Sequence, residues 1–276
     1  MTHEGENMEY LRAVDLEGIG GVVGTAYQTL NGSPDFDIAK KNAIREINAA
    51  AKALFEMGAT KVAVWDNHGG GGNLDFSKMD SRIVKVEKGA NEYRLDFSKN
   101  HNFKGIIFLG YHAREGTFGG VLAHTFSSVS IQYAKINGRP VGELEIDSYI
   151  AATHGIAPLF LASDDVCVNQ FKETSPATVT VVTKYGKGRN SAELRDEDEV
   201  VREIYEGVKA SVTANIPLVE IKCPIPYEVR YTRAEKAAEM YERGISDDGI
   251  DSVKYGDDTH TLHYVINSQN RLSYVL

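Results

Sequence analysis

The segment IREINAAAKALFEMGATKVAVW at residues 44–65 decides the fold class. Its first part carries apolar residues at helical spacing until Gly58, and residues 61–65 then form a short apolar run typical of a buried strand. Upstream, residues 10–14 form a similar run that ends at Asp15. The order strand, helix, strand requires a right-handed crossover, and the sequence therefore predicts a parallel sheet.

Further runs extend the predicted sheet and add a hairpin. Residues 128–136 alternate apolar and polar side chains and close on Asn137-Gly138, which is the pattern of a β-hairpin. Three other short apolar runs, flanked by polar residues or glycine, predict central strands at 82–86, 105–109 and 158–162.

Cap residues predict where helices begin. Ser33 as N-cap and Pro34 at the first helical position begin the helix that ends at Gly58. The stretch 141–153 is also expected to be helical. Capping-box spacings precede two later helices, at Asn190 with Glu193 and at Thr232 with Glu235.

We therefore expect an α/β protein with a mainly parallel central sheet, flanking helices and a smaller C-terminal layer of strands and helices. A chain of 276 residues exceeds the usual size of one core, so it forms one large domain or two closely joined ones. The best candidate for a boundary is the stretch 174–187. On this interpretation residues 1–180 form a metal-binding α/β domain, and residues 181–276 form an α+β layer packed on it.

Charge and composition exclude several classes of protein. Thirty basic and 39 acidic side chains give a net charge of −9, and no basic cluster exceeds a doublet, so neither nucleic acid nor an anionic membrane is expected as a partner. No signal-peptide core and no membrane-spanning apolar run is present, and we expect a cytoplasmic protein. Cys167 and Cys223 are too few for a disulfide scaffold and lack the CxxC spacing of a zinc site.

Common cofactor and catalytic motifs are not satisfied. Gly18, Gly20 and Gly24 resemble a dinucleotide loop, but Val23 breaks the GxGxxG pattern. Asn7 stands where HExxH requires a second His, and neither a phosphate-binding P-loop nor GxSxG occurs. Rossmann, zincin, P-loop and serine-hydrolase interpretations are therefore disfavoured.

Polar side chains instead follow the apolar runs. In a parallel sheet, the residues after each strand meet in a crevice at the carboxyl edge, so groups far apart in the sequence can converge there. Asp15 and Glu17 would point to the same side of an extended backbone and repel each other unless a cation lies between them. Carboxylates with imidazoles suit zinc, manganese or related divalent ions, and a bridging carboxylate can hold two of them. The candidates are Asp15 and Glu17, Asp66-Asn67-His68, Tyr111-His112, His124 and Glu143.

Each candidate also has a purely structural explanation. The two acids could lie in a solvated turn, and His68 could be a loop histidine beside a glycine run that allows close approach to a ligand. His112 and His124 could be satisfied core histidines, and Glu143 could stabilise a first helical turn. Asp147, one turn after Glu143, repels it, so one of the two requires a cation or bulk water. The joint pattern favours a metal site.

Five segments, in order, resemble the zinc D-aminopeptidases of bacterial dipeptide-transport operons. By motif, the resemblance implies that Asp15, Glu17, His68, His112 and Glu143 bind two Zn²⁺ ions per subunit. It also implies that His124 is the catalytic residue near the reacting carbonyl. The segments are VDLEGIGG at 14–21, WDNHGGGGNL at 65–74, LGYHAREGTFGGVLAHTF at 109–126, NGRPVGELEIDSYIAATHG at 137–155 and LASDD at 161–165.

The resemblance further implies a homodecamer of two stacked five-fold rings that admits short peptides with an N-terminal D-amino acid such as D-Ala. The chain departs from the family at Asn67, where Ser is frequent, and at the glycine run 69–72, which bears on the shape of the substrate pocket. Two other functions use the same residue types. One is two-metal hydrolysis of phosphoesters, and the other is a non-catalytic ring subunit that binds metal or peptide.

Overall fold

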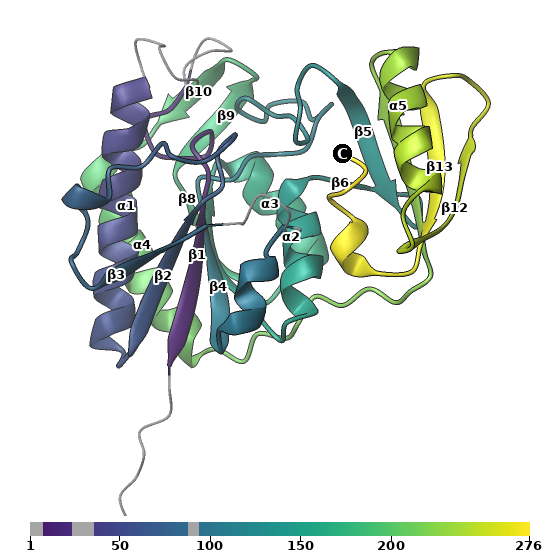
Figure 1. Cartoon of the computed structure of the whole chain (residues 1–276). Coiled ribbons are helices and arrows are strands. Elements are labelled where there is room, and N and C mark those ends of the chain that lie inside the picture. The colour runs from purple at the N-terminus through teal and green to yellow at the C-terminus, as the bar shows by residue number, and fades with distance from the viewer. Residues whose placement is uncertain (1–7, 24–35, 88–93) are drawn as a thin grey trace, which may run out of the picture.

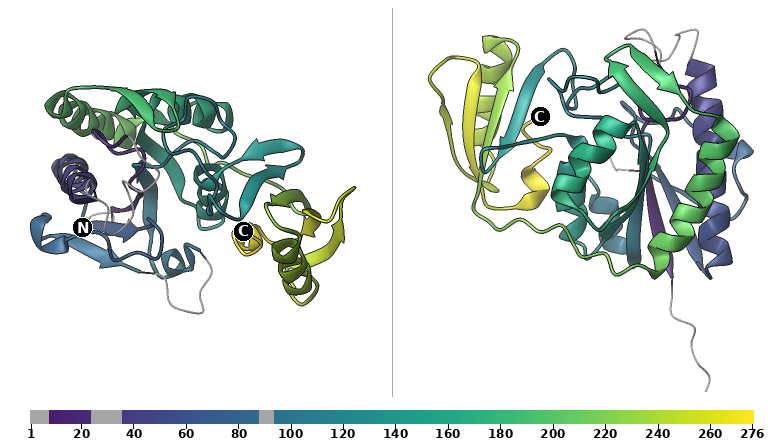
Figure 2. Two further views of the ribbon diagram at one scale, coloured as in Figure 1. Left: turned by 90° about the horizontal axis from the view of Figure 1, so that it is seen from above. Right: turned by 180° about the vertical axis from the view of Figure 1, so that it is seen from behind.

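The computed structural model describes residues 8–23, 36–87 and 94–276 of the chain (Figure 1). Within these ranges a six-stranded parallel sheet and a five-stranded antiparallel sheet form two layers, with one further two-stranded ribbon. The antiparallel layer, formed mostly by the C-terminal part of the chain, lies to one side of the parallel sheet (Figure 2). The predicted fold class, an α/β protein with a smaller C-terminal layer, is confirmed.

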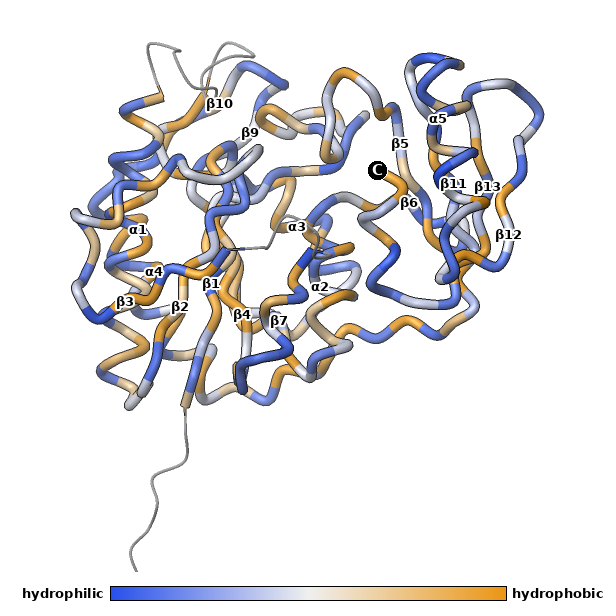
Figure 3. The backbone as a smooth tube through the Cα atoms, viewed as in Figure 1, coloured by the Kyte–Doolittle hydropathy of each residue, from blue (hydrophilic) through white to orange (hydrophobic). Residues whose placement is uncertain are grey.

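The parallel sheet has its first strand near the centre, so the chain winds outward from it in both directions. The strand order is β3-β2-β1-β4-β7-β8, and neighbouring strands pair in parallel throughout. The apolar composition of β4 and β7 is visible as orange stretches of the tube (Figure 3). The strands are β1 (Glu9–Val14), β2 (Lys61–Asp66), β3 (Ile83–Val86), β4 (Phe103–Leu109), β7 (Ala157–Ser163) and β8 (Val179–Val182).

The register of the central strands aligns their carboxyl ends. Val14 at the end of β1 lies opposite Asp66 on β2 and Leu109 on β4. Backbone bonds continue past the strands, since the Asp15 N–H donates to the Leu109 carbonyl (2.9 Å) and the Asn67 N–H donates to the Val14 carbonyl (2.8 Å). Side chains that follow these three strands are therefore brought to one edge of the sheet.

Helices cover both faces of the parallel sheet. Alternate residues of β1 enter opposite cores, Tyr10 and Val14 on the side of α1 and α4, and Leu11 and Ala13 on the side of α2 and α3. Of the described helices, none combines the length and apolarity needed to cross a bilayer. The helices are α1 (Phe36–Glu56), α2 (Glu143–Ala152), α3 (Asp165–Thr174), α4 (Glu197–Thr213) and the short η1 (Phe76–Lys78) and η2 (Asp96–Asn100).

The second layer is an antiparallel sheet with strand order β12-β13-β11-β5-β6, covered by α5. The predicted hairpin is confirmed as β5–β6, and both turn residues, Asn137 and Gly138, have positive φ as a tight hairpin requires. Its elements are β5 (Ile131–Ile136), β6 (Arg139–Val141), β11 (Ile225–Tyr231), α5 (Ala234–Ile245), β12 (Ile250–Tyr255), β13 (Thr261–Ile266) and η3 (Gln269–Arg271).

Two helix caps differ from prediction. The Asn190–Glu193 pair begins no helix, because residues Ser191–Leu194 form strand β10 against β9 (Lys184–Gly188), and Asp196 caps α4 instead. Thr232 donates its hydroxyl to the Val129 carbonyl, and Arg233 takes the N-cap position of α5. The helix start predicted at Ser33 and Pro34 lies outside the described residues.

The two layers interleave along the chain. Hairpin β5–β6 comes from the middle of the sequence, between β4 and β7 of the parallel sheet, but belongs to the antiparallel sheet. Helix α4 follows the parallel sheet in sequence and packs back onto it, against α1 and β8. The division of the chain into 1–180 and 181–276 thus stays a prediction about folding units.

Candidate metal centre

Asp15 and Glu17 form the first wall of the site, directly after β1. Both are almost fully buried, with 3% and 4% of their surface exposed. Nδ1 of His68 lies 2.9 Å from Oδ1 of Asp15 and 3.3 Å from Oε2 of Glu17. Burial, followed by the charge of Glu17, raises the pKa of Asp15 to about 7. Burial acts the same way on Glu17, but the charge of His68 outweighs it and holds the pKa of Glu17 well below its usual value.

Two glycines let the loops that carry Asp15 and His112 pack backbone against backbone. The Gly18 N–H donates to the Gly110 carbonyl (2.7 Å), and a Cβ at position 18 would lie 2.0 Å from the Tyr111 carbonyl oxygen. Gly110 has φ +74°, and a Cβ there would lie 2.2 Å from the Asp15 carbonyl oxygen. Any larger residue at either position would separate the two loops.

Lys184 holds the loop that carries Asp15 and Glu17 in place through backbone hydrogen bonds. Its side chain is fully buried, and its Nζ donates to the backbone carbonyls of Glu17 (2.5 Å) and Ile19 (2.8 Å). Burial lowers the pKa of Lys184 to about 8. The sequence contained no signal for this contact, because more than 160 residues separate the partners.

His68 comes from the loop after β2, and Asp66 shapes that loop instead of joining the cluster. The Asp66 carboxylate accepts the backbone N–H groups of Asn73 (2.5 Å) and Leu74 (3.1 Å), which closes the loop around residues 69–72. Burial would lower the pKa of His68, but the charges of Glu17 and Asp15 and their hydrogen bonds raise it to about 12.

His112, His124 and Glu143 form the opposite wall. His112 donates from Nδ1 to the Ala113 carbonyl (3.0 Å), which turns Nε2 toward Oε1 of Glu143 at 3.2 Å and Oδ2 of Asp15 at 3.5 Å. The His124 ring stacks on the His112 ring with centroids 3.9 Å apart. Nε2 of His124 lies 3.7 Å from Oε1 of Glu143. The six side chains predicted as ligands or catalyst therefore meet in one cluster.

The donor atoms of this cluster have the spacing of a cation site. Two sets hold their donors within 4.8 Å of one another, namely Asp15, Glu17 and His112, and His112, His124 and Glu143. Nε2 of His112 is buried and, within the described residues, makes no hydrogen bond of good geometry, although Oε1 of Glu143 lies 3.2 Å away. A buried imidazole nitrogen that faces carboxylates and is fixed through its other nitrogen fits the ligand environment of a divalent ion, which would bind it in place of a proton.

The pKa values show how the cluster balances its charge. Burial would lower the pKa of His112, but Glu143 and then Asp15 outweigh it and raise the pKa to about 10. Burial would raise the pKa of Glu143, but the hydrogen bond and charge of His112 hold it at about 2. His68 and His112 thus take up protons as the counter-charges of the buried acids. Because a divalent ion would take over that role, its binding would release protons.

A second ring of polar groups supports the cluster. Asn67 donates to the Tyr111 hydroxyl (2.8 Å), which donates to Oδ2 of Asp147 (2.6 Å). Arg94 binds the Asp147 carboxylate through Nε and Nη2, and its Nη2 lies 3.6 Å from Oε2 of Glu143. The cation that the closely spaced acids of α2 require is therefore Arg94, which the sequence pattern did not identify.

A buried acid and imidazole cluster at the carboxyl edge of a parallel sheet is the kind of centre that metal-assisted hydrolases use. The sequence profile of the D-aminopeptidase peptidase family matches residues 8–258, and the chain belongs to this family of peptide-cleaving hydrolases. The family resemblance inferred from the five motif segments is thereby confirmed.

A curated sequence and a solved structure, both from Bacillus subtilis, are similar to this chain. A D-aminopeptidase of strain 168 is 28% identical over 184 residues, which is 67% of this chain and 66% of the relative, so the match spans just under two thirds of its length. The solved structure of the zinc-dependent D-aminopeptidase DppA, a self-compartmentalizing protease, has a TM-score of 0.86. The sequences are 22% identical, and the structural match covers 97% of this chain and 95% of the DppA chain, which shows a common fold.

Replacing Lys184 by Met should destabilise the protein. The variant removes the buried ammonium that donates to the carbonyls of Glu17 and Ile19, while the Ile19 carbonyl keeps the bond from the Val22 N–H (3.2 Å), and we expect the free energy of unfolding to fall by about 2–4 kcal/mol. Chemical denaturation of both proteins measures the difference. Lys187→Met, at an exposed lysine that pairs with Glu193 (3.3 Å), should change it by less than about 0.5 kcal/mol. Equal losses in the two variants would contradict the role of Lys184.

Proposed function

We propose that this chain is a di-zinc aminopeptidase that removes the N-terminal residue, D-Ala or a similar D-amino acid, from short peptides. The observation that carries the proposal is the convergence of acids and imidazoles from separate segments into one buried cluster. Membership of the D-aminopeptidase family supports the reaction and the preference for D-residues.

In this proposal Asp15, Glu17, His68, His112 and Glu143 hold two Zn²⁺ ions. The inward-facing Nε2 of His112 supports the assignment, and the two closely spaced donor sets contain four of these residues, Asp15, Glu17, His112 and Glu143, together with His124. The zinc dependence of DppA supports the choice of metal. Zinc, when bound, lowers the pKa of a water molecule toward neutrality and polarises the carbonyl of the peptide.

His124 would transfer protons. Its Nδ1 lies 2.8 Å from the Leu122 carbonyl, and because a carbonyl only accepts, Nδ1 carries the proton and Nε2 has a free lone pair. Burial, followed by the charge of His112, lowers the pKa of His124 and favours this neutral form. Nε2 can then accept a proton from the attacking water and pass it to the leaving amine. The free amine of the substrate would lie against a carboxylate of the cluster.

We extend the proposal to the assembly, a homodecamer of two stacked five-fold rings built from subunits with a 1–180 domain and a 181–276 layer. The self-compartmentalizing character of DppA supports a closed assembly. Light scattering of the purified protein tests it, and a mass of one or two subunits would contradict it.

Hydrolysis of matched dipeptides tests the function directly. We expect the zinc-loaded protein to cleave a dipeptide with N-terminal D-Ala faster than its L-Ala counterpart, and the chelated protein to cleave neither. Phosphomonoesters assayed in parallel should remain intact. Turnover of a phosphomonoester but not of peptides would favour the phosphoesterase alternative, and zinc-loaded protein inert toward both would favour a non-catalytic ring subunit.

His124→Ala should retain zinc but lose most activity. Removal of a proton-transfer group typically lowers turnover by roughly 10²–10⁴-fold, and the other donors of the cluster stay in place. Turnover and zinc content, measured by elemental analysis, are compared with those of His260→Ala, which alters a histidine in the turn between β12 and β13. A near wild-type rate in His124→Ala would remove this residue from the mechanism.

His68→Ala and Asp15→Ala should lose metal. Each removes one donor from a site whose groups are buried together, so zinc content should fall well below that of wild type and of His124→Ala. Thermal unfolding gives a second measurement: added zinc should raise the melting temperature of the wild type and have little effect on either variant. Full occupancy in both variants would refute the ligand assignment.

A further inference from the structure

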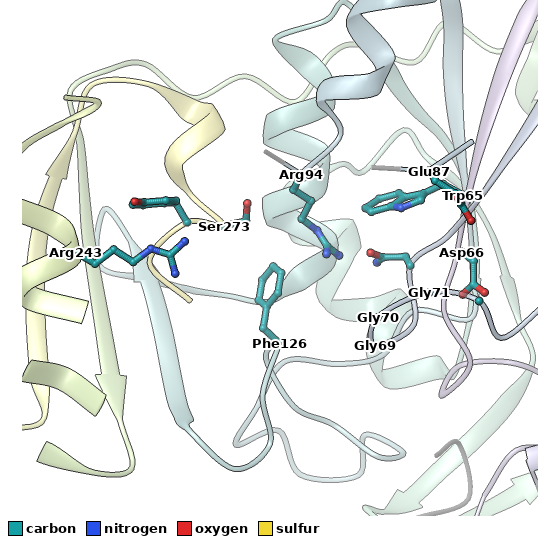
Figure 4. A pocket seen from close by; sticks show the side chains of 13 residues that line it. Trp65, Asp66, Gly69, Gly70, Gly71, Glu87, Arg94, Phe126, Arg243 and Ser273 are labelled. Carbon is teal, nitrogen blue, oxygen red and sulfur yellow. The ribbon is translucent and has the colours of Figure 1, made fainter. Parts of the chain in front are cut away.

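A cavity of about 560 Å³ lies beside the ligand cluster, between the two layers. Its volume is in the range of sites that hold small ligands. Figure 4 shows Arg243 and Ser273 on one side and Trp65, Asp66 and the glycine loop on the other, with Phe126 and Arg94 between them. The two sides come from different parts of the fold, since Arg243 belongs to α5 and Ser273 follows η3.

The cavity and the ligand cluster share a wall. Asn67 and Gly69, the neighbours of His68 in the sequence, both line the cavity. Phe126 lines it as well, and its backbone N–H donates to Oε1 of Glu143 (2.8 Å). A substrate whose reacting bond lies at the cluster can therefore extend directly into the cavity.

The glycine run leaves room for such a substrate. A Cβ placed at Gly69, Gly70 or Gly72 would meet no other atom within 4 Å, so the loop presents bare backbone to open space. Gly69 and Gly72 also have positive φ, which disfavours larger residues there. The departure at 69–72 noted in the sequence thus lies on a wall of this cavity.

The charged groups of the cavity differ in whether they already have partners. Arg94 binds Asp147, and its guanidinium lies between the Trp65 and Phe126 rings, 4.9 and 4.8 Å from their centroids. Asp66 accepts hydrogen bonds from its own loop, and Glu87 pairs with Lys85. These groups are engaged within the protein.

Arg243 is different. Its guanidinium lies 3.8 Å from the centroid of the Tyr274 ring, which orients it, and within the described part of the chain no acidic group lies within 4.0 Å of it. The side chain is exposed, so no burial penalty opposes its charge. A planar guanidinium held against a ring and lacking an acid is well suited to bind a carboxylate through two parallel hydrogen bonds.

We propose that this cavity binds the C-terminal part of a short peptide and that Arg243 pairs with its terminal carboxylate. The inference rests on the proposed aminopeptidase function and names its substrate class: short linear peptides with both ends free. The acids of the cluster attract the amino end of the peptide, and Arg243 attracts the other end. Arg243 is thus a specificity-determining residue, separate from the groups that perform the chemistry.

The experiment compares a D-Ala dipeptide and tripeptide, each as the free acid and as the C-terminal amide. The proteins are wild type, Arg243→Gln, Arg243→Lys and the control Arg202→Gln, which removes an exposed arginine of α4. Of the dipeptide and tripeptide acids, we consider the one with the lower KM. In wild type, its KM should be roughly ten- to a hundredfold below that of the corresponding amide, as expected for one charge-assisted contact. Arg243→Gln should raise KM for the acid by that factor, leaving kcat and KM for the amide unchanged.

The controls separate binding from structural effects. Arg243→Lys should recover part of the preference for the acid, Arg202→Gln should behave as wild type, and all four proteins should unfold at the same denaturant concentration. Equal KM values of wild type for acid and amide, or an equal rise for both in Arg243→Gln, would overturn the inference.

A binding measurement keeps the inference distinct from the proposed function. Calorimetric titration of the zinc-loaded His124→Ala and His124→Ala/Arg243→Gln proteins with the same acids and amides requires no turnover. Preferential binding of the acid that depends on Arg243, together with a zinc-loaded wild-type protein that cleaves no peptide, would support the carboxylate site and contradict the peptidase. If the wild type cleaves the peptides but the His124→Ala protein binds acid and amide with equal affinity, the peptidase is supported and the carboxylate site is contradicted.

Discussion

Burial of several carboxylates in one place is the constraint on which the rest of the structure depends. Removing Asp15, Glu17 and Glu143 from water is costly unless positive charge accompanies them. The protein supplies it in two shells, with His68 and His112 among the acids and Arg94 behind them. Replacing one partner leaves a buried charge uncompensated and destabilises the fold, so each of these side chains depends on the others.

The fold meets this constraint through backbone more than through side chains. Parallel register brings the ends of β1, β2 and β4 level, and two glycines then allow the following loops to touch. Lys184 fixes the resulting acidic loop by its carbonyls, and His112 and His124 are each oriented through a backbone carbonyl. The C-terminal part of the chain, which includes the antiparallel layer, supplies the far wall of the neighbouring cavity.

The sequence predicts those parts of the site that follow from local pattern. Strand ends are visible as the last residue of an apolar run, so the convergence of the groups after β1, β2 and β4 could be anticipated. The contacts of Arg94 with Asp147 and of Lys184 with the acidic loop could not, because the partners are distant in the sequence. The Asn190–Glu193 pair shows the opposite error, since a valid capping spacing is overridden where β10 pairs with β9.

His112 belongs to both donor sets of the cluster, and this sharing has a stoichiometric consequence. An imidazole nitrogen carries a single lone pair, and the Nδ1 of this ring is already engaged with Ala113, so only one cation at a time can claim it. If the cluster holds two cations as proposed, their positions are unequal: one is completed by this ring, and the other relies on oxygen donors and a different histidine, so the two ions would differ in how tightly they are held.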